Sequence, residues 1–82
     1  MITPERIESL IVSKLPDARV RLNDLTGGGD HWEAVVVSAA FQGKSLVEQH
    51  QLVYSALGAE MKQEIHALQL RTLTPEKAAA GG

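Results

Sequence analysis

Apolar residues recur every three or four positions at the start of the chain, as on one face of an amphipathic helix. The stripe consists of Ile7, Leu10, Ile11 and Leu15. Thr3 can cap this helix, and Pro4 has the backbone torsion that suits a first helical position. Pro16 ends the helix after Leu15. The pattern predicts a helix from Pro4 to Leu15 that packs one face on a core.

Three later segments carry strand patterns. Residues 18–23 alternate strictly, with Ala18, Val20 and Leu22 on one face and Arg19, Arg21 and Asn23 on the other. Residues 31–38 are more continuously apolar, which indicates a more buried strand. Residues 66–72 alternate again, with Leu68 and Leu70 inward. The first two strands are expected to pair as an antiparallel hairpin across residues 24–30, a loop that three consecutive glycines should make flexible.

A long helix is expected between the second and third strands. After a short turn over residues 39–43, Ser45 can cap a helix that reaches about Lys62, passing through Gly58. Its predicted apolar stripe is Leu46, His50, Val53, Leu57 and Met61, widened by Val47 and Tyr54. Because a helix joins the second and third strands, these should be parallel, and His31 and His66 would open them at the same edge of the sheet.

Composition limits the classes of protein that fit. The 82 residues suffice for one small domain, and the apolar fraction of 44% and charged fraction of 22% are typical of globular proteins. The absence of cysteine excludes disulfides, a thiol nucleophile and a thiolate metal cage. A net charge of −2 argues against general attraction to nucleic acid or anionic lipid. No membrane span or signal peptide is visible, so a cytoplasmic location is expected.

The three histidines are the main candidates for chemistry. His31 and His66 are each consistent with an ordinary surface histidine, but together at one sheet edge they form half of a metal site. His50 falls on the apolar helix stripe, where a structural role bonded to backbone is favoured over an additional ligand role. No serine has a base placed beside it and no carboxylate pair shares a predicted pocket, so we do not expect an enzyme.

A small basic patch is predicted on the open face of the sheet. Arg19, Arg21 and Arg71 all point there on the strand alternation. The patch is either a solvated face partly neutralised by Glu33 or a docking surface for an acidic partner or nucleic acid.

Several motifs together resemble the BolA family. They are residues 28–32 (GGDHW), 38–47 (SAAFQGKSLV), 49–54 (QHQLVY), 65–72 (IHALQLRT) and 74–76 (TPE). The resemblance implies an α/β domain of the class II KH-like type, α-β-β-α-α-β, with a mixed three-stranded sheet. The domain would span residues 1–76, and residues 77–82 would be a flexible Ala/Gly tail.

The family resemblance also implies a function. It suggests a non-enzymatic adaptor in iron–sulfur cluster biogenesis or iron regulation, whose partner is a monothiol glutaredoxin with glutathione. A 2Fe–2S cluster would be held only when shared with that partner. His66 matches the family's C-terminal histidine ligand, and His31 matches a loop position that carries His or Cys. Histidine can replace thiolate on one iron of such a centre. A homodimer is left open.

The alternative function is a nucleic-acid-binding transcriptional regulator that uses the KH-like fold, with the three arginines and Lys44 as its contacts. Nucleic-acid-binding KH domains clamp the backbone with a GxxG loop. The corresponding turn here is Gly43-Lys44-Ser45-Leu46, which lacks the second glycine, and Gln49 and Gln51 stand where many relatives carry arginine. This function therefore ranks second.

Overall fold

A computed structural model of the chain describes residues 2–65 and 67–81. The elements in chain order are α1 (Pro4–Lys14), β1 (Arg19–Asp24), β2 (His31–Val37), the short 3₁₀ helix η1 (Ala39–Phe41), α2 (Leu46–Leu57), α3 (Glu60–Gln63), β3 (Ala67–Leu73) and α4 (Pro75–Ala79). The helix and strand order that the sequence predicts is confirmed, with boundaries that move by one residue in most elements.

The sheet has the strand order β1-β2-β3. β1 and β2 pair antiparallel, whereas β2 and β3 pair parallel in a register that sets His31 against Ala67 and Val37 against Leu73. The mixed sheet and the α-β-β-α-α-β order are those of a class II KH-like domain, so the predicted fold class is confirmed.

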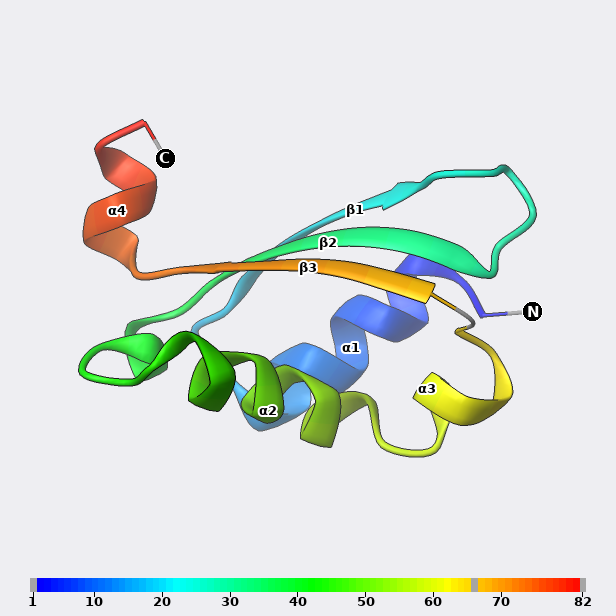
Figure 1. The fold of residues 1–82 in the computed structure, drawn as a ribbon, viewed down its shortest axis with the longest axis horizontal. Helices are drawn as coiled ribbons and strands as arrows, with labels where there is room; N and C mark the ends of the chain where they lie inside the picture. Colours follow the sequence, from blue (N-terminus) through cyan, green and yellow to red (C-terminus); the bar gives the residue numbers. More distant parts are fainter. Residues whose placement is uncertain (1, 66, 82) are drawn as a thin grey trace.

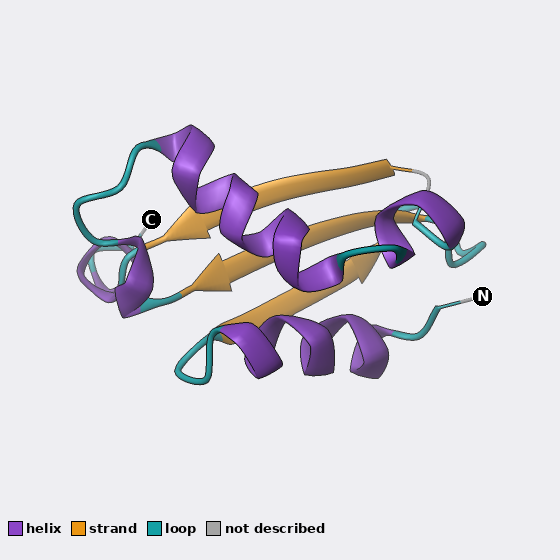
Figure 2. Cartoon of the chain, turned by 90° about the horizontal axis from the view of Figure 1, so that it is seen from below, coloured by secondary structure: helices purple, strands orange, loops and turns teal. Residues whose placement is uncertain are grey.

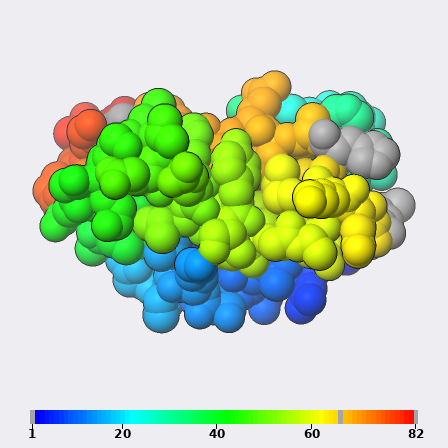
Figure 3. Space-filling model, turned by 60° about the horizontal axis from the view of Figure 1, so that its bottom comes forward, coloured from blue at the N-terminus to red at the C-terminus, as the bar shows by residue number. Residues whose placement is uncertain are grey.

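The molecule has a helical layer on one face of the sheet. α1, α2 and α3 cover that face, while α4 rises on the opposite side at the far end of β3 (Figures 1 and 2). α1 and α2 lie side by side across the helical layer (Figure 3). The core between the layers consists of Ile2, Ile7, Ile11, Leu15, Trp32, Val36, Phe41, Val53, Leu57 and Ile65. Among the described residues, no helix has the length and hydropathy needed to cross a bilayer.

The predicted long helix is in fact two. α2 ends at Leu57, and Gly58 follows with φ 56° and ψ −129°, a backbone conformation that side chains other than glycine rarely adopt. α3 then begins at Glu60. The prediction of a continuous helix to Lys62 was therefore wrong, because Gly58 ends the helix instead of being tolerated inside it.

The predicted stripe of α2 was also partly wrong. Val53 and Leu57 are buried, but Leu46 and Val47 are 62% and 65% exposed. Gln49 takes the inward position one turn before Val53. Its amide nitrogen donates to the carbonyl oxygen of Lys44 at 3.0 Å, and its amide oxygen accepts from the Thr72 hydroxyl. A polar side chain occupies this position because it satisfies backbone and side-chain groups that leucine could not.

Side-chain caps define where the helices begin. The Thr3 hydroxyl accepts from the Arg6 N–H at the start of α1, as predicted. Ser45 and Glu48 form a reciprocal capping box on α2, and these hydrogen bonds lower the pKa of the Glu48 carboxyl. Thr74 caps α4, whose helix includes residues 77–79 of the predicted tail. That the tail beyond residue 76 is flexible stays a prediction.

Asp17 joins the end of α1 to the start of η1. Its carboxylate accepts from the Ala39 N–H at 2.8 Å and from the Ser38 hydroxyl at 2.7 Å. These two donors lower the pKa of Asp17 below its ordinary value. The contact spans 22 residues of sequence, and the pattern of the chain gives no sign of it.

Candidate functional site

The loop between β1 and β2 is organised by one carboxylate at its start. Asp24 Oδ1 accepts from the Gly27 N–H at 3.0 Å and from the Thr26 N–H at 3.3 Å, and Oδ2 accepts from the Gly29 N–H at 2.9 Å. Gly27 and Gly29 have positive φ values of 79° and 77°, which explains why glycine is needed there. The loop therefore has a defined hydrogen-bonded shape, which its three glycines alone would not provide.

The far end of the loop is fixed to the core and to β3. Trp32 is buried, and its indole N–H donates to the Gly29 carbonyl at 3.1 Å. The Ala67 N–H donates to the Asp30 carbonyl at 3.2 Å. These bonds hold the chain on both sides of His31 and bring the loop to the edge where β3 begins (Figure 1).

His31 opens β2 at this edge. It alternates with the buried Trp32, so it falls on the open face of the sheet, and 44% of its side chain is exposed. Its Nδ1 lies 2.9 Å from Asp30 Oδ1. An ionised carboxylate only accepts hydrogen bonds, so Nδ1 carries the proton in the neutral ring and the lone pair is on Nε2. This carboxylate–histidine pairing is common among metal-binding histidines.

His66, the other predicted ligand, lies outside the described residues. The residue that follows it in the sequence, Ala67, is the register partner of His31. The parallel pairing of β2 and β3 that led us to expect both histidines at one edge is thus confirmed, while the predicted ligand role of each stays a prediction.

His50 lies apart from this edge, in the middle of α2. Its ring is half-buried and meets the Tyr54 ring edge-on, with centroids 6.2 Å apart. The half-burial agrees with the prediction, but Nε2 does not form the predicted hydrogen bond to backbone, since it is buried and has no partner among the described residues.

The predicted basic patch exists on the open face. Arg19, Arg21 and Arg71 are all exposed, and Glu33 lines the same shallow hollow as Arg21 and Arg71. Lys44 is exposed as well, but it lies in the turn before α2.

Sequence reasoning missed Asp24 and Asp30 as parts of the site. An Asp just before a Gly-rich turn is a known signal for a side chain that bonds the turn's own N–H groups. That signal could have identified Asp24. Within residues 2–65 and 67–81, no group of three or more His, Asp or Glu side chains is placed to hold a metal ion.

The fold and the site together define a class II KH-like domain that presents a carboxylate-paired histidine beside a hydrogen-bonded glycine loop. The family model described as "BolA-like protein" matches residues 3–77. The chain belongs to the BolA family.

Relatives and solved structures cover most of the chain. It is 43% identical over 79 residues to Protein BOLA2 of Arabidopsis thaliana, covering 94% of this chain and 84% of that protein. It is 32% identical over 81 residues to the DNA-binding transcriptional regulator BolA of Escherichia coli K12, covering 90% and 77%. The structure of a bolA protein homologue from Coxiella burnetii superposes with a TM-score of 0.82 at 39% identity, covering 96% and 99%.

Proposed function

We propose that this chain is a non-enzymatic adaptor in iron–sulfur cluster biogenesis or iron regulation. In this role His31 and His66 are ligands of a 2Fe–2S cluster shared with a monothiol glutaredoxin, which supplies thiolate ligands together with glutathione. The cluster belongs to the complex, because this chain has no cysteine with which to hold it alone.

The observation that carries this proposal is the contact between His31 and Asp30. The Nδ1–Oδ1 distance of 2.9 Å assigns the ring proton to Nδ1, so Nε2 keeps the lone pair that a metal needs. The ring lies on the open face with 44% of its side chain accessible. A partner can therefore approach it without rearrangement of the core.

The geometry of the edge also fits a shared site. His31 is paired in register with Ala67, the residue that follows His66 in the sequence. The described part of the chain holds no three-ligand group. In the proposed complex the thiolate ligands come from another molecule, because the sequence contains no cysteine.

Cluster reconstitution with a monothiol glutaredoxin and glutathione tests the proposal. The mixture should develop a visible circular dichroism spectrum that differs from that of the glutaredoxin alone. His31→Ala and His66→Ala should each lose this difference. His50→Ala is the matched control, since it removes an imidazole from α2 and should keep the mixed spectrum.

The outcome that contradicts the proposal is equally specific. If both single variants keep the mixed spectrum at wild-type intensity, neither imidazole coordinates the cluster. Thermal unfolding of all three histidine variants is compared before reconstitution. Equal unfolding temperatures show that a lost spectrum is not caused by an unfolded or aggregated variant.

Nucleic-acid binding is the second candidate, and the name of the Escherichia coli relative favours it. Two features here weigh against it. The turn at Gly43 lacks a second glycine, and the Gln49 amide is engaged with Lys44 and Thr72 instead of facing solvent. Binding through the basic face should weaken with salt by a slope of about −0.9 per phosphate contacted on duplex DNA. A mobility-shift assay without binding at low salt removes this candidate.

A further inference from the structure

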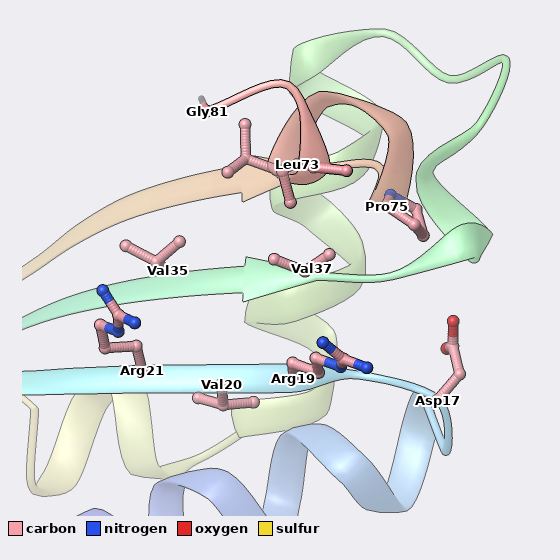
Figure 4. A pocket seen from close by; sticks show the side chains of 11 residues that line it. Asp17, Arg19, Val20, Arg21, Val35, Val37, Leu73, Pro75 and Gly81 are labelled. Atoms are coloured by element: carbon pink, nitrogen blue, oxygen red, sulfur yellow. The ribbon is translucent and has the colours of Figure 1, made fainter.

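The sheet has one face without a layer of helices, and that face is not built as an ordinary solvated surface. Its central strand presents Val35 and Val37, both half-buried, beside Leu73 of β3. α4 stands at one end and contributes Pro75 and Ala78 to the wall (Figure 4). Together they enclose an open hollow of about 770 Å³ with an apolar floor.

Arginines surround this floor. Three of the four arginines of the chain, Arg19, Arg21 and Arg71, lie on this face. Arg21 and Arg71 share a register row on either side of Val35, so their backbones are roughly 10 Å apart. Arg19 follows along β1 at roughly 7 Å. The guanidinium groups of Arg19 and Arg21 extend over the same side of the sheet as Val35 and Val37 (Figure 4).

In the described part of the chain, these positive charges have no acidic side chain as an ion-pair partner. Among residues 2–65 and 67–81, none of the three guanidinium groups forms an ion pair or a hydrogen bond with another side chain. Asp17 lines the end of the hollow, but its carboxylate is engaged by Ser38 and Ala39. A chain with a net charge of −2 thus concentrates unpaired positive charge around one apolar strip.

The shape of the surface selects the kind of ligand. A second hollow of about 380 Å³ adjoins the first and shares Arg21 and Val35 with it. The two extend over register rows from Arg19 to Asn23, which is roughly 13 Å along a strand. An elongated, open strip of this length fits several residues of an extended peptide better than a small molecule, which would need a more enclosed pocket.

The residue types on this face favour a protein ligand over single-stranded nucleic acid. Sheet faces that bind single strands use aromatic side chains on which the bases stack. The Trp32 and Phe41 side chains are buried in the core, and Tyr54 is on α2 in the helical layer. Arginine beside aliphatic residues is instead the composition of a protein interface that recognises carboxylates.

We propose that the face lined by Arg19, Arg21, Arg71, Val35, Val37 and Leu73 binds an extended acidic segment of a partner protein. The segment carries Asp or Glu side chains toward the three arginines and an aliphatic side chain between them toward Val35 and Val37. Glu33 lies at the other end of the strip and disfavours a carboxylate there, so the segment binds in one direction. His31 is on the same face of the sheet but lines neither hollow, and the proposal does not depend on cluster binding.

Nuclear magnetic resonance titration of the intact chain tests the proposal. The probe is a synthetic peptide with the repeat Glu-Ser-Leu-Ser, in which Glu and Leu fall on the same side of an extended chain. It should shift the methyl signals of Val35, Val37 and Leu73 at low salt. The same peptide with Lys in place of Glu should not. Shifts confined to other methyl groups, or equal shifts with both peptides, overturn the proposal.

Charge variants provide the matched comparison. Arg21→Glu should lower the affinity for the Glu peptide by about tenfold, because attraction to the peptide's carboxylates becomes repulsion. Arg6→Glu makes the same charge change on α1 and should alter the affinity by less than about twofold. Glu33→Gln should strengthen binding, a result that a damaged fold would not produce. Affinity that is equal in Arg21→Glu and Arg6→Glu overturns the proposal.

Two further ligands complete the test. A single-stranded oligothymidine that shifts the same methyl signals and binds with higher affinity than the Glu peptide would assign the face to nucleic acid. A medium-chain fatty acid that does so would assign it to amphipathic small molecules. Either result overturns the protein-segment proposal.

Discussion

The carboxylate of Asp24 accepts a hydrogen bond from the Gly29 N–H at 2.9 Å, across the whole loop that leads to His31. One side chain at the end of β1 therefore fixes the path of the glycines that follow it. The position of His31 depends on this closure as well as on the pairing of β2, because the loop determines how the chain enters the strand.

We expect Asp24→Ala to loosen this loop. The variant leaves three backbone N–H groups without their acceptor, and because two of these hydrogen bonds are exposed, the loss of free energy for those two is at the lower end of the usual range. Unfolding free energy should fall by about 1–2 kcal/mol. Urea denaturation measures the loss, and amide exchange at Gly27 and Gly29 should accelerate. Asn23→Ala, one residue earlier on the open face, is the control and should change neither. Amide exchange at Gly27 and Gly29 that is unchanged in Asp24→Ala would show that Asp24 does not hold the loop.

Asp30→Asn should reverse the tautomer of His31. The asparagine amide can donate to Nδ1, which moves the ring proton to Nε2 and removes the lone pair that would bind iron. Nitrogen-15 chemical shifts of the His31 ring report the tautomer directly, without any cluster. In the proposed complex, cluster affinity should fall by about 10–100-fold. A ring that keeps its proton on Nδ1 in this variant would show that another group orients His31.

Gly58→Ala should destabilise the protein. In a helix interior this substitution would stabilise by up to about 1 kcal/mol, but the positive φ at Gly58 makes the expected effect a loss of about 1–3 kcal/mol. An added Cβ meets nothing closer than the Ser55 carbonyl at 3.9 Å, so the loss reflects backbone conformation, not a clash. Gln51→Gly, in the exposed middle of α2, is the comparison and should also destabilise. A more stable Gly58→Ala would mean that α2 and α3 are one helix.

Asp17 should make the free energy of unfolding depend on pH in the acidic range. Its pKa is lowered in the folded state by the Ala39 N–H and the Ser38 hydroxyl. The resulting stabilisation is fully present above the ordinary value of 3.8 and is lost as the pH falls through the lower, folded-state value. Asp17→Asn should therefore be less stable than wild type at neutral pH, and the difference should shrink in acid.

Urea midpoints at about pH 7 and about pH 3 measure this difference. Glu48 also has a lowered pKa, but it is present in both proteins and cancels in the comparison. Glu8→Gln is the control on the exposed side of α1. A gap between Asp17→Asn and wild type that stays constant with pH would show that the carboxylate charge is not what Ser38 and Ala39 stabilise.

Most helices and strands follow from local patterns and are confirmed by the structure, although the helix predicted to reach Lys62 is divided at Gly58. Period-two alternation over residues 18–23 fixes which side chains of β1 face solvent, and Thr3 and Ser45 mark helix starts through their own caps. The predicted α2 stripe failed at Leu46 and Val47 because an apolar residue is buried only where another element covers it. The sequence pattern cannot show that the sheet and η1 cover Gln49 instead.

The sequence by itself determined the order of the elements, the pairing of the hairpin and the edge to which His31 belongs, since each depends on contacts between near neighbours or on the connection of parallel strands. The tertiary structure alone decided that Asp17 reaches Ser38, that the Ala67 N–H donates to the Asp30 carbonyl beside His31, and that α4 closes one end of a basic hollow around Val35. The physical reason is that hydrogen bonds and pockets depend on distances of a few ångströms, which the periodicity of a chain does not specify.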